Sequence, residues 1–300
     1  MPERRTDLAV EAKEIWAQGE RAGTLTGVVS QDKTRDGFAV TTVRITDERG
    51  AAALGKPVGT YVTVELDRFI YREDDAFELG ARALAAELTA LLGAGARESV
   101  LVVGLGNKAI TADAIGPATV RSTMVTSHLV DRLPETFGTL RRVYALEAGV
   151  MGTTGIESAR LVRAVSESIR PDRVLVVDAL ASRSLKRICR TVQLADTGIV
   201  PGSGVNNARE GLNSETLGVP VIAVGVPTVV DAGTLAADIV ERAGATGIDL
   251  AELESFGEGL IVTPKEIDGN VGDISKLVGY AINMALHPDL TLNDITMFLG

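Results

Sequence analysis

The chain has 300 residues, of which 45% are apolar and only 4% aromatic, and its formal net charge is −10. This length and apolar content suffice for one large domain with a core of aliphatic side chains. A protein that tracks phosphate backbones needs a basic face, so the acidic balance argues against direct nucleic-acid binding. No apolar run reaches the roughly 18 residues that span a bilayer, and we expect no membrane partner.

Cysteine usage and the glycine motifs further restrict the compartment and the cofactors that this protein is expected to have. The single cysteine is Cys189, so no internal disulfide can form, and the sequence shows no signal peptide. Both features predict a reducing, cytoplasmic compartment. The run GLGNKA has Ala109 where a dinucleotide fingerprint has its last glycine, and the chain contains no phosphate-binding P-loop motif. We therefore expect no cofactor.

The N-terminal part of the chain changes from polar to β-like to helical. Its first dozen residues are polar, and a short helix is expected at Glu11–Gln18. Three runs rich in Thr and Val (TLTGVV, FAVTTVRI and TYVTVEL) are separated by turn sequences, which predicts a β-rich insertion or subdomain over about 24–70. Apolar positions at helical spacing then predict a helix at 73–93.

The rest of the chain alternates apolar strands with helices. Strands are expected at 99–106, 174–180 and 219–227, and helices at Ala114–Val130, Ser158–Ile169, Val229–Gly244 and Ile274–Leu286. Buried strands that alternate with helices are typical of a mainly parallel sheet covered on both faces. We therefore predict a three-layer α/β fold, with helices on both faces of a mainly parallel sheet, plus the N-terminal β-rich region.

Two aspartates occupy positions where this architecture places active sites, outside the carboxyl ends of the strands. Asp113 follows the strand VLVVG, and Asp178 ends the strand VLVVD. Two close carboxyl groups do not easily ionise together, so one can act as general base toward a water while the other donates a proton. The alternative is that each aspartate only caps a helix or a loop.

A glycine-rich loop, DTGIVPGSGVNNAR, is a second candidate for function. It carries Asp196, Ser203, Asn206 and Asn207, and its backbone donors would line a substrate groove or form a structural turn. The sequence gives little support for a serine or cysteine hydrolase, because no nucleophile motif such as GxSxG is present. One cysteine and two histidines also argue against a zinc site, and we expect no bound metal.

Taken in chain order, several motifs together resemble the germination protease of spore-forming bacteria. They are RTDLAVEA, VGLGN followed by TADAIGP, GVMGTTGIE, VDALASRS, DTGIVPGSGVNN and VPVIAVGVPTVVDA, and they cover most of the chain. The resemblance implies an atypical endopeptidase whose α/β core is similar to that of hydrogenase maturation proteases. It also implies that Asp113 and Asp178 are the catalytic pair.

The resemblance carries further expectations about substrate, activation and assembly. Family members begin the degradation of small acid-soluble spore proteins during germination, in the spore core. They are made as zymogens that remove their own N-terminal propeptide, and they assemble as homotetramers. The implied partners are therefore the acid-soluble proteins and further copies of this chain.

The N-terminus contains a candidate site for self-cleavage. Family substrates are cut after the acidic residue of a Thr-Glu-apolar-Ala sequence, and Thr6-Asp7-Leu8-Ala9 has this pattern with Asp in place of Glu. We therefore predict cleavage between Asp7 and Leu8. Residues 1–7 would be the propeptide, and residues 8–300 a single α/β peptidase domain.

Two other functions remain as alternatives. Hydrogenase maturation proteases hold nickel through two carboxylates and a histidine, but no histidine lies between Asp178 and His287. Acid–base chemistry with a bound water is therefore favoured over a metal-dependent reaction. The other alternative is a non-catalytic α/β binding protein, and the presence of both aspartates with their surrounding motifs argues against it.

Overall fold

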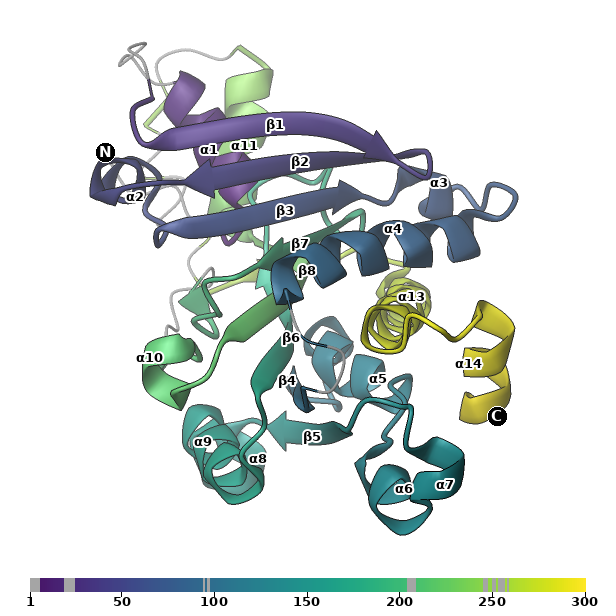
Figure 1. The fold of residues 1–300 in the computed structure, drawn as a ribbon. Helices are drawn as coiled ribbons and strands as arrows, with labels where there is room; N and C mark the ends of the chain where they lie inside the picture. Colours follow the sequence, from purple (N-terminus) through teal and green to yellow (C-terminus); the bar gives the residue numbers. More distant parts are fainter. Residues whose placement is uncertain are drawn as a thin grey trace.

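In the computed structural model of this chain, helices flank one large sheet (Figure 1). The residues described are 6–18, 25–93, 95, 98–203, 209–244, 248–249, 252, 257 and 259–300. Within these residues the strands are β1 Val28–Arg35, β2 Phe38–Ile45, β3 Gly59–Glu65, β4 Val100–Leu105, β5 Val143–Gly149, β6 Arg173–Ala181, β7 Thr191–Ala195, β8 Val221–Asp231 and β9 Ile261–Val262.

The sheet has a parallel part and an antiparallel part, with strand order β1-β2-β3-β7-β8-β6-β4-β5. β5, β4, β6 and β8 pair in parallel, and β4 is buried along its whole length. Strands buried on both faces must be apolar throughout, which explains the runs VLVVGL and VIAVGV. β1, β2, β3 and β7 extend the same sheet by antiparallel pairing.

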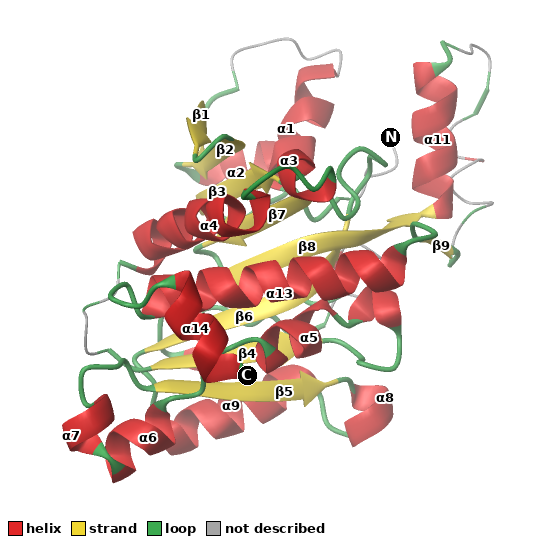
Figure 2. Ribbon diagram, turned by 90° about the vertical axis from the view of Figure 1, so that its right-hand side faces the viewer, coloured by secondary structure: helices red, strands yellow, loops and turns green. Residues whose placement is uncertain are grey.

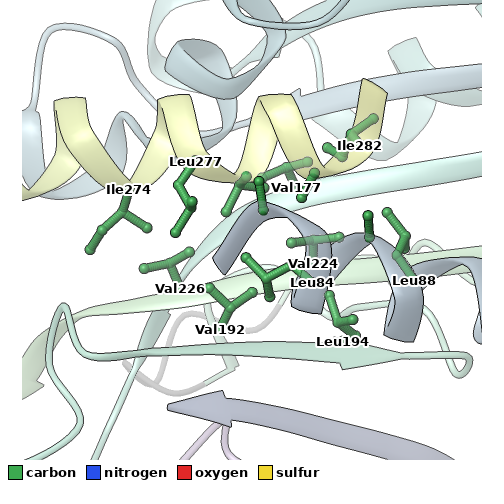
Figure 3. Packing of buried hydrophobic residues seen from close by; sticks show 14 of the residues in the cluster. Leu84, Leu88, Val177, Val192, Leu194, Val224, Val226, Ile274, Leu277 and Ile282 are labelled. Atoms are coloured by element: carbon green, nitrogen blue, oxygen red, sulfur yellow. The ribbon is translucent and has the colours of Figure 1, made fainter. Parts of the chain in front are cut away.

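Helices cover both faces of the sheet (Figures 1 and 2). On one face, α4 (Ala76–Leu92), α5 (Ile115–Arg121) and α13 (Ile267–Leu286) pack over the main core, and α14 (Leu292–Leu299) follows α13. Figure 3 shows side chains of α4 and α13 meeting Val192, Val224 and other strand residues. The opposite face is covered by α1 (Ala9–Gln18) and α9 (Ser158–Ile169).

The remaining helices are short or lie at the ends of the sheet. They are α2 Glu48–Leu54, α3 Asp67–Ile70, α6 Ser127–Arg132, α7 Pro134–Phe137, α8 Met151–Thr154, α10 Ser214–Leu217 and α11 Ala232–Arg242, with a 3-10 turn at Thr111–Asp113. The predicted α/β fold with helices on both faces of the sheet is confirmed.

One predicted helix is wrong. The expected helix Ala114–Val130 is two helices, α5 and α6, separated by residues 122–126. The break is held by Asn283 of α13, whose side-chain amide donates to the Ser122 carbonyl and accepts from the Met124 N–H, at 2.9 and 2.8 Å. These tertiary hydrogen bonds replace helical ones in a segment whose Ser and Thr residues are weak helix formers.

Three strands, β5, β7 and the two-residue β9, have no counterpart in the sequence prediction. β5 is an edge strand of mixed burial, so its sequence VYALEAG lacks a clear apolar run. β7 has only five residues, although all five are buried. β7 joins the β-rich region to the parallel strands, because it pairs with β3 on one side and β8 on the other.

Two glycines permit the close approach of α5 to the strand ends. A Cβ on Gly116 would lie 2.2 Å from the Leu105 carbonyl oxygen and 2.6 Å from that of Val177. A Cβ on Gly104 would lie 2.4 Å from the Gly116 carbonyl oxygen. Only hydrogen fits on either side of this contact. The start of α5 therefore rests directly on the backbone of β4 and β6.

A glycine substitution tests this contact. We expect Gly116→Ala to lower the free energy of unfolding by about 3 kcal/mol, because an added methyl group must push backbone against backbone. Gly272 in α13 is the matched control, since a Cβ added there would meet no atom within 4 Å outside the backbone of its own helix. Gly272→Ala should stabilise the protein by about 0.5–1 kcal/mol through helix propensity. Urea denaturation measures both values, and equal effects at the two positions would contradict the packing argument.

Candidate active site

The site lies where β4 ends beside β6. The sequence predicted that Asp178 ends its strand, but β6 continues to Ala181 through its pairing with β8. The two strands are paired in parallel, with Val103 opposite Val176 and Gly104 opposite Val177. Asp178 is the next residue of β6, and the segment that leaves β4 leads to the 3-10 turn ending at Asp113. The register of this pair therefore brings both predicted aspartates to one edge of the sheet.

Asp178 is a buried carboxyl group on a central strand. Only 6% of its surface is exposed. Its Oδ1 accepts a hydrogen bond from the Ala179 N–H at 2.9 Å. Burial raises the pKa of Asp178 well above its usual range, and the negative charges of Asp113 and Asp7 raise it further.

Asp113 is half-buried and has more neighbouring groups that favour its ionised form than Asp178 has. Its Oδ2 accepts a hydrogen bond from the Asn107 N–H at 2.7 Å. Burial raises the pKa of Asp113, whereas this hydrogen bond and the Arg209 guanidinium oppose the rise. Thr228 of β8 supports the turn, because its hydroxyl donates to the Ala112 carbonyl at 2.6 Å.

Both aspartates line one cavity of about 580 Å³. Its walls come from the ends of β4, β6 and β8, from residues 200–202 and from Arg209, and most of the lining is apolar. Within the pair, Asp113 has partners that stabilise a carboxylate, whereas Asp178 is deeply buried beside it. The environment therefore favours an ionised Asp113 next to a protonated Asp178.

The N-terminal segment reaches the same cavity. Asp7 lines it, and the Asp7 side chain accepts hydrogen bonds from the Ala181 N–H at 2.8 Å and the Ser203 hydroxyl at 2.6 Å. The Asp7 carbonyl accepts from the Gln193 side chain at 3.1 Å. Leu8 is fully buried. Asp7, the first residue of the predicted cleavage bond, is thus held at the cavity that contains the aspartate pair.

The glycine-rich loop divides between structural and cavity-lining residues. Asp196 accepts a hydrogen bond from the Thr60 N–H at 2.7 Å, which ties the end of β7 to β3. Ser203 donates its hydroxyl to Asp7. Asn206 and Asn207 lie outside the described residues.

Sequence reasoning missed three residues that shape the site: Gln193, Arg209 and Thr228. Each sits apart from the two aspartate motifs, and none belongs to a recognisable catalytic pattern. Gln193 carries the one usable signal, a polar residue within the apolar run TVQLA of a buried strand. A polar side chain retained in a buried strand is normally hydrogen-bonded, and this one binds the N-terminal segment.

Two kinds of feature are absent from the described residues. No group of three His, Cys, Asp or Glu side chains in that part of the chain is arranged to hold a metal ion. No helix there combines the length and apolar character needed to cross a membrane.

Comparison with known proteins identifies the family. A family model described as germination protease matches residues 7–243. The germination protease of Clostridium perfringens is 41% identical over 322 residues, covering 99% of both chains. That of Caldanaerobacter subterraneus subsp. tengcongensis is 41% identical, covering 98% of both. That of Bacillus pumilus is 36% identical, covering 97% of this chain and 95% of the relative.

Among solved structures, a NiFe hydrogenase maturation protease, HycI from Thermococcus kodakarensis, matches with a TM-score of 0.36 and 17% identity. The match covers 65% of this chain and 98% of that one. The full-length identity to curated relatives and the family match confirm the resemblance that the sequence motifs indicated. The chain therefore belongs to the germination protease family of peptidases.

Proposed function

We propose that this protein is an endopeptidase that begins the degradation of small acid-soluble spore proteins during germination, in the cytoplasm of the spore core. Family membership supports the peptidase activity and its place in germination. The observation that carries the chemistry is the pair of carboxyl groups, Asp113 and Asp178, in one cavity with environments that favour opposite protonation states. We further propose that the enzyme works as a homotetramer, as the family resemblance implies.

In the proposed reaction, Asp113 is the general base and Asp178 the general acid. A water molecule attacks the scissile carbonyl carbon and loses a proton to the Asp113 carboxylate. Asp178 donates a hydrogen bond or its proton to the carbonyl oxygen as the tetrahedral intermediate forms. The C–N bond then breaks as the proton held by Asp113 passes to the leaving nitrogen, and Asp178 recovers its proton as the carbonyl of the new carboxylic acid re-forms. Arg209 and the Asn107 N–H oppose the rise in the pKa of Asp113 that its burial causes, and so they favour the ionised base.

Removal of either carboxyl group tests this assignment. We expect Asp113→Asn and Asp178→Asn each to lower kcat on a purified small acid-soluble spore protein by about 10²–10⁴, the range for loss of a general acid or base. Asp131→Asn is the control, because Asp131 is exposed and pairs with Arg142 at the other end of the sheet. Near-normal activity in a folded Asp113 or Asp178 variant would show that this aspartate is structural.

The stability of the Asp178→Asn variant provides a second test. An aspartate ordinarily has a pKa near 3.8, and the folded-state pKa of Asp178 is raised well above it. The stability that Asp178 contributes is therefore fully present below pH 3.8 and is lost as the pH rises through the folded pKa. Asparagine resembles the protonated acid and does not titrate.

We therefore expect Asp178→Asn to be more stable than the wild-type protein at neutral pH, because the wild-type carboxyl group must either take up a proton or be buried as a charge on folding. The difference should shrink as the pH falls. Urea denaturation at a series of pH values measures it. A difference that stays constant with pH, or a less stable variant at pH 7, would contradict a protonated Asp178.

We also propose that the protein is a zymogen that cleaves its own Asp7–Leu8 bond, with residues 1–7 as propeptide. The position of Asp7 at the cavity of the aspartate pair supports this proposal. Incubated wild-type protein is expected to shorten, with Leu8 as its new first residue by N-terminal sequencing. The Asp113→Asn variant should stay intact. A different first residue would refute this bond, and processing of the variant would point to another protease.

A further inference from the structure

The N-terminal segment is held by a set of contacts that act on one acidic residue and on the backbone on both sides of it. The carboxylate of Asp7 receives two hydrogen bonds, from the Ala181 N–H and the Ser203 hydroxyl, at 2.8 and 2.6 Å. The Asp7 N–H donates to the Ala181 carbonyl at 3.1 Å. Ala181 thus pairs with Asp7 through both of its backbone groups.

Gln193 binds the backbone of Asp7 and Ala9 through its side-chain amide. Its side-chain NH2 donates to the Asp7 carbonyl at 3.1 Å, and its side-chain oxygen accepts from the Ala9 N–H at 2.8 Å. Gln193 is only 7% exposed. An amide that makes both hydrogen bonds to a peptide backbone fixes its direction without reading its side chains. On the other side of Asp7, the Lys56 ammonium donates to the Thr6 carbonyl at 2.8 Å.

The residue after the acidic one enters an apolar pocket. Leu8 is fully buried and packs with Val10, Leu180 and Ile199. A large aliphatic side chain buried there contributes about 1.5–3 kcal/mol. The segment is therefore recognised at two successive side chains, one acidic and one apolar, and along its backbone.

Sheet register relates this set of contacts to the catalytic pair. Gln193 of β7 and Asp178 of β6 both lie opposite Gly225 of β8. Residues in one row across a sheet project from the same face, and two strand spacings separate these Cα atoms by about 10 Å. Asp7 lines the cavity of the aspartate pair and also a neighbouring cavity of about 230 Å³ that contains Lys56 and Gln193.

We propose that these contacts form the substrate subsites of the enzyme, and that residues 6–9 occupy them in this chain. Ala181 and Ser203 select an acidic residue before the cleaved bond, Gln193 holds the backbone across that bond, and Leu180 with Ile199 accepts the apolar residue after it. The family resemblance already implies a peptide with an acidic residue followed by an apolar one as the ligand, and these contacts name the residues that would recognise it. This inference rests on the proposed function. It assigns the direct hydrogen bonds to the acidic side chain to neutral donors, and the nearby Lys56 ammonium attracts the same charge.

Cleavage of matched peptides tests the subsites. The peptides span residues 3–12 of this chain, with Asp or Asn in place of residue 7, and are added to protein that has completed self-processing. Ser203→Ala should reduce the Asp:Asn preference in kcat/KM about fivefold to tenfold, because it removes a hydrogen bond to a charged group at a partly exposed position. Gln193→Met should lower kcat/KM for both peptides about equally. Ser214→Ala, an exposed serine of α10, is the control and should change neither value.

The outcomes distinguish a failure of the subsite assignment from a failure of the proposed function. If cleavage depends on Asp113 but Ser203→Ala keeps the wild-type Asp:Asn preference, the subsite assignment is overturned and the peptidase stands. If cleavage does not depend on Asp113, the proposed mechanism fails. The contacts can then still be tested without catalysis.

The catalysis-free test is a thermal double-mutant cycle on protein that carries Asp113→Asn and Asp178→Asn and whose intact mass shows that residue 7 is still attached. Ser203→Ala is expected to lower Tm by about 2 °C when residue 7 is Asp, and to have less than half that effect in combination with Asp7→Ala. Such coupling supports the subsite. Independent, additive effects would overturn it, because they would show that Ser203 does not hold the Asp7 carboxylate in solution.

Discussion

The parallel pairing of β4 with β6 brings two carboxyl groups that are far apart in sequence to one cavity, and the rest of the site is arranged around this contact. Gly104 and Gly116 let the start of α5 rest on the two strand ends, so the turn that carries Asp113 is held against the strand that carries Asp178. The hydroxyl of Thr228 then ties the same turn to β8. Rigid strands and a backbone-to-backbone contact fix the two acids more firmly than free loops would.

Holding these acids together has an energetic cost, which the protein distributes unevenly. Asp178 is buried on a central strand, where ionisation is unfavourable, while Asp113 receives a backbone hydrogen bond and the field of Arg209. In the proposed mechanism, this asymmetry would provide a base and an acid from two identical side chains. Asp7 adds a third negative charge that raises the pKa of Asp178 further, so departure of residues 1–7 would lower that pKa. Self-processing would thus alter the electrostatics of the site as well as its accessibility.

The β-rich N-terminal region has a role in the site through β7. Because β7 pairs with β3 and with β8, it joins the N-terminal strands to the parallel strands in one continuous sheet. Gln193 projects from β7 toward the N-terminal segment, and α1 covers the same face. Glu11 of α1 strengthens this arrangement by accepting the N–H groups of Arg183 and Ser184, at 2.7 and 3.0 Å, just after β6. The segment that enters the cavity is therefore anchored on both sides.

The sequence by itself determined the α/β class, the helices of ten or more residues, the apolar strands and the candidate aspartates, because each depends on local patterning or on a motif near a strand end. It also identified the family. It did not determine the break between α5 and α6, which depends on Asn283 from α13. Nor did it determine the short strand β7, which forms because β3 and β8 pair with it on either side. The contacts proposed as subsites around Asp7 could not be predicted from the sequence either, because Ala181, Gln193 and Ser203 share no motif. These residues meet only when β6, β7 and the following loop fold against the N-terminus. Tertiary structure decided these features, since a hydrogen bond between distant residues leaves no period in the sequence.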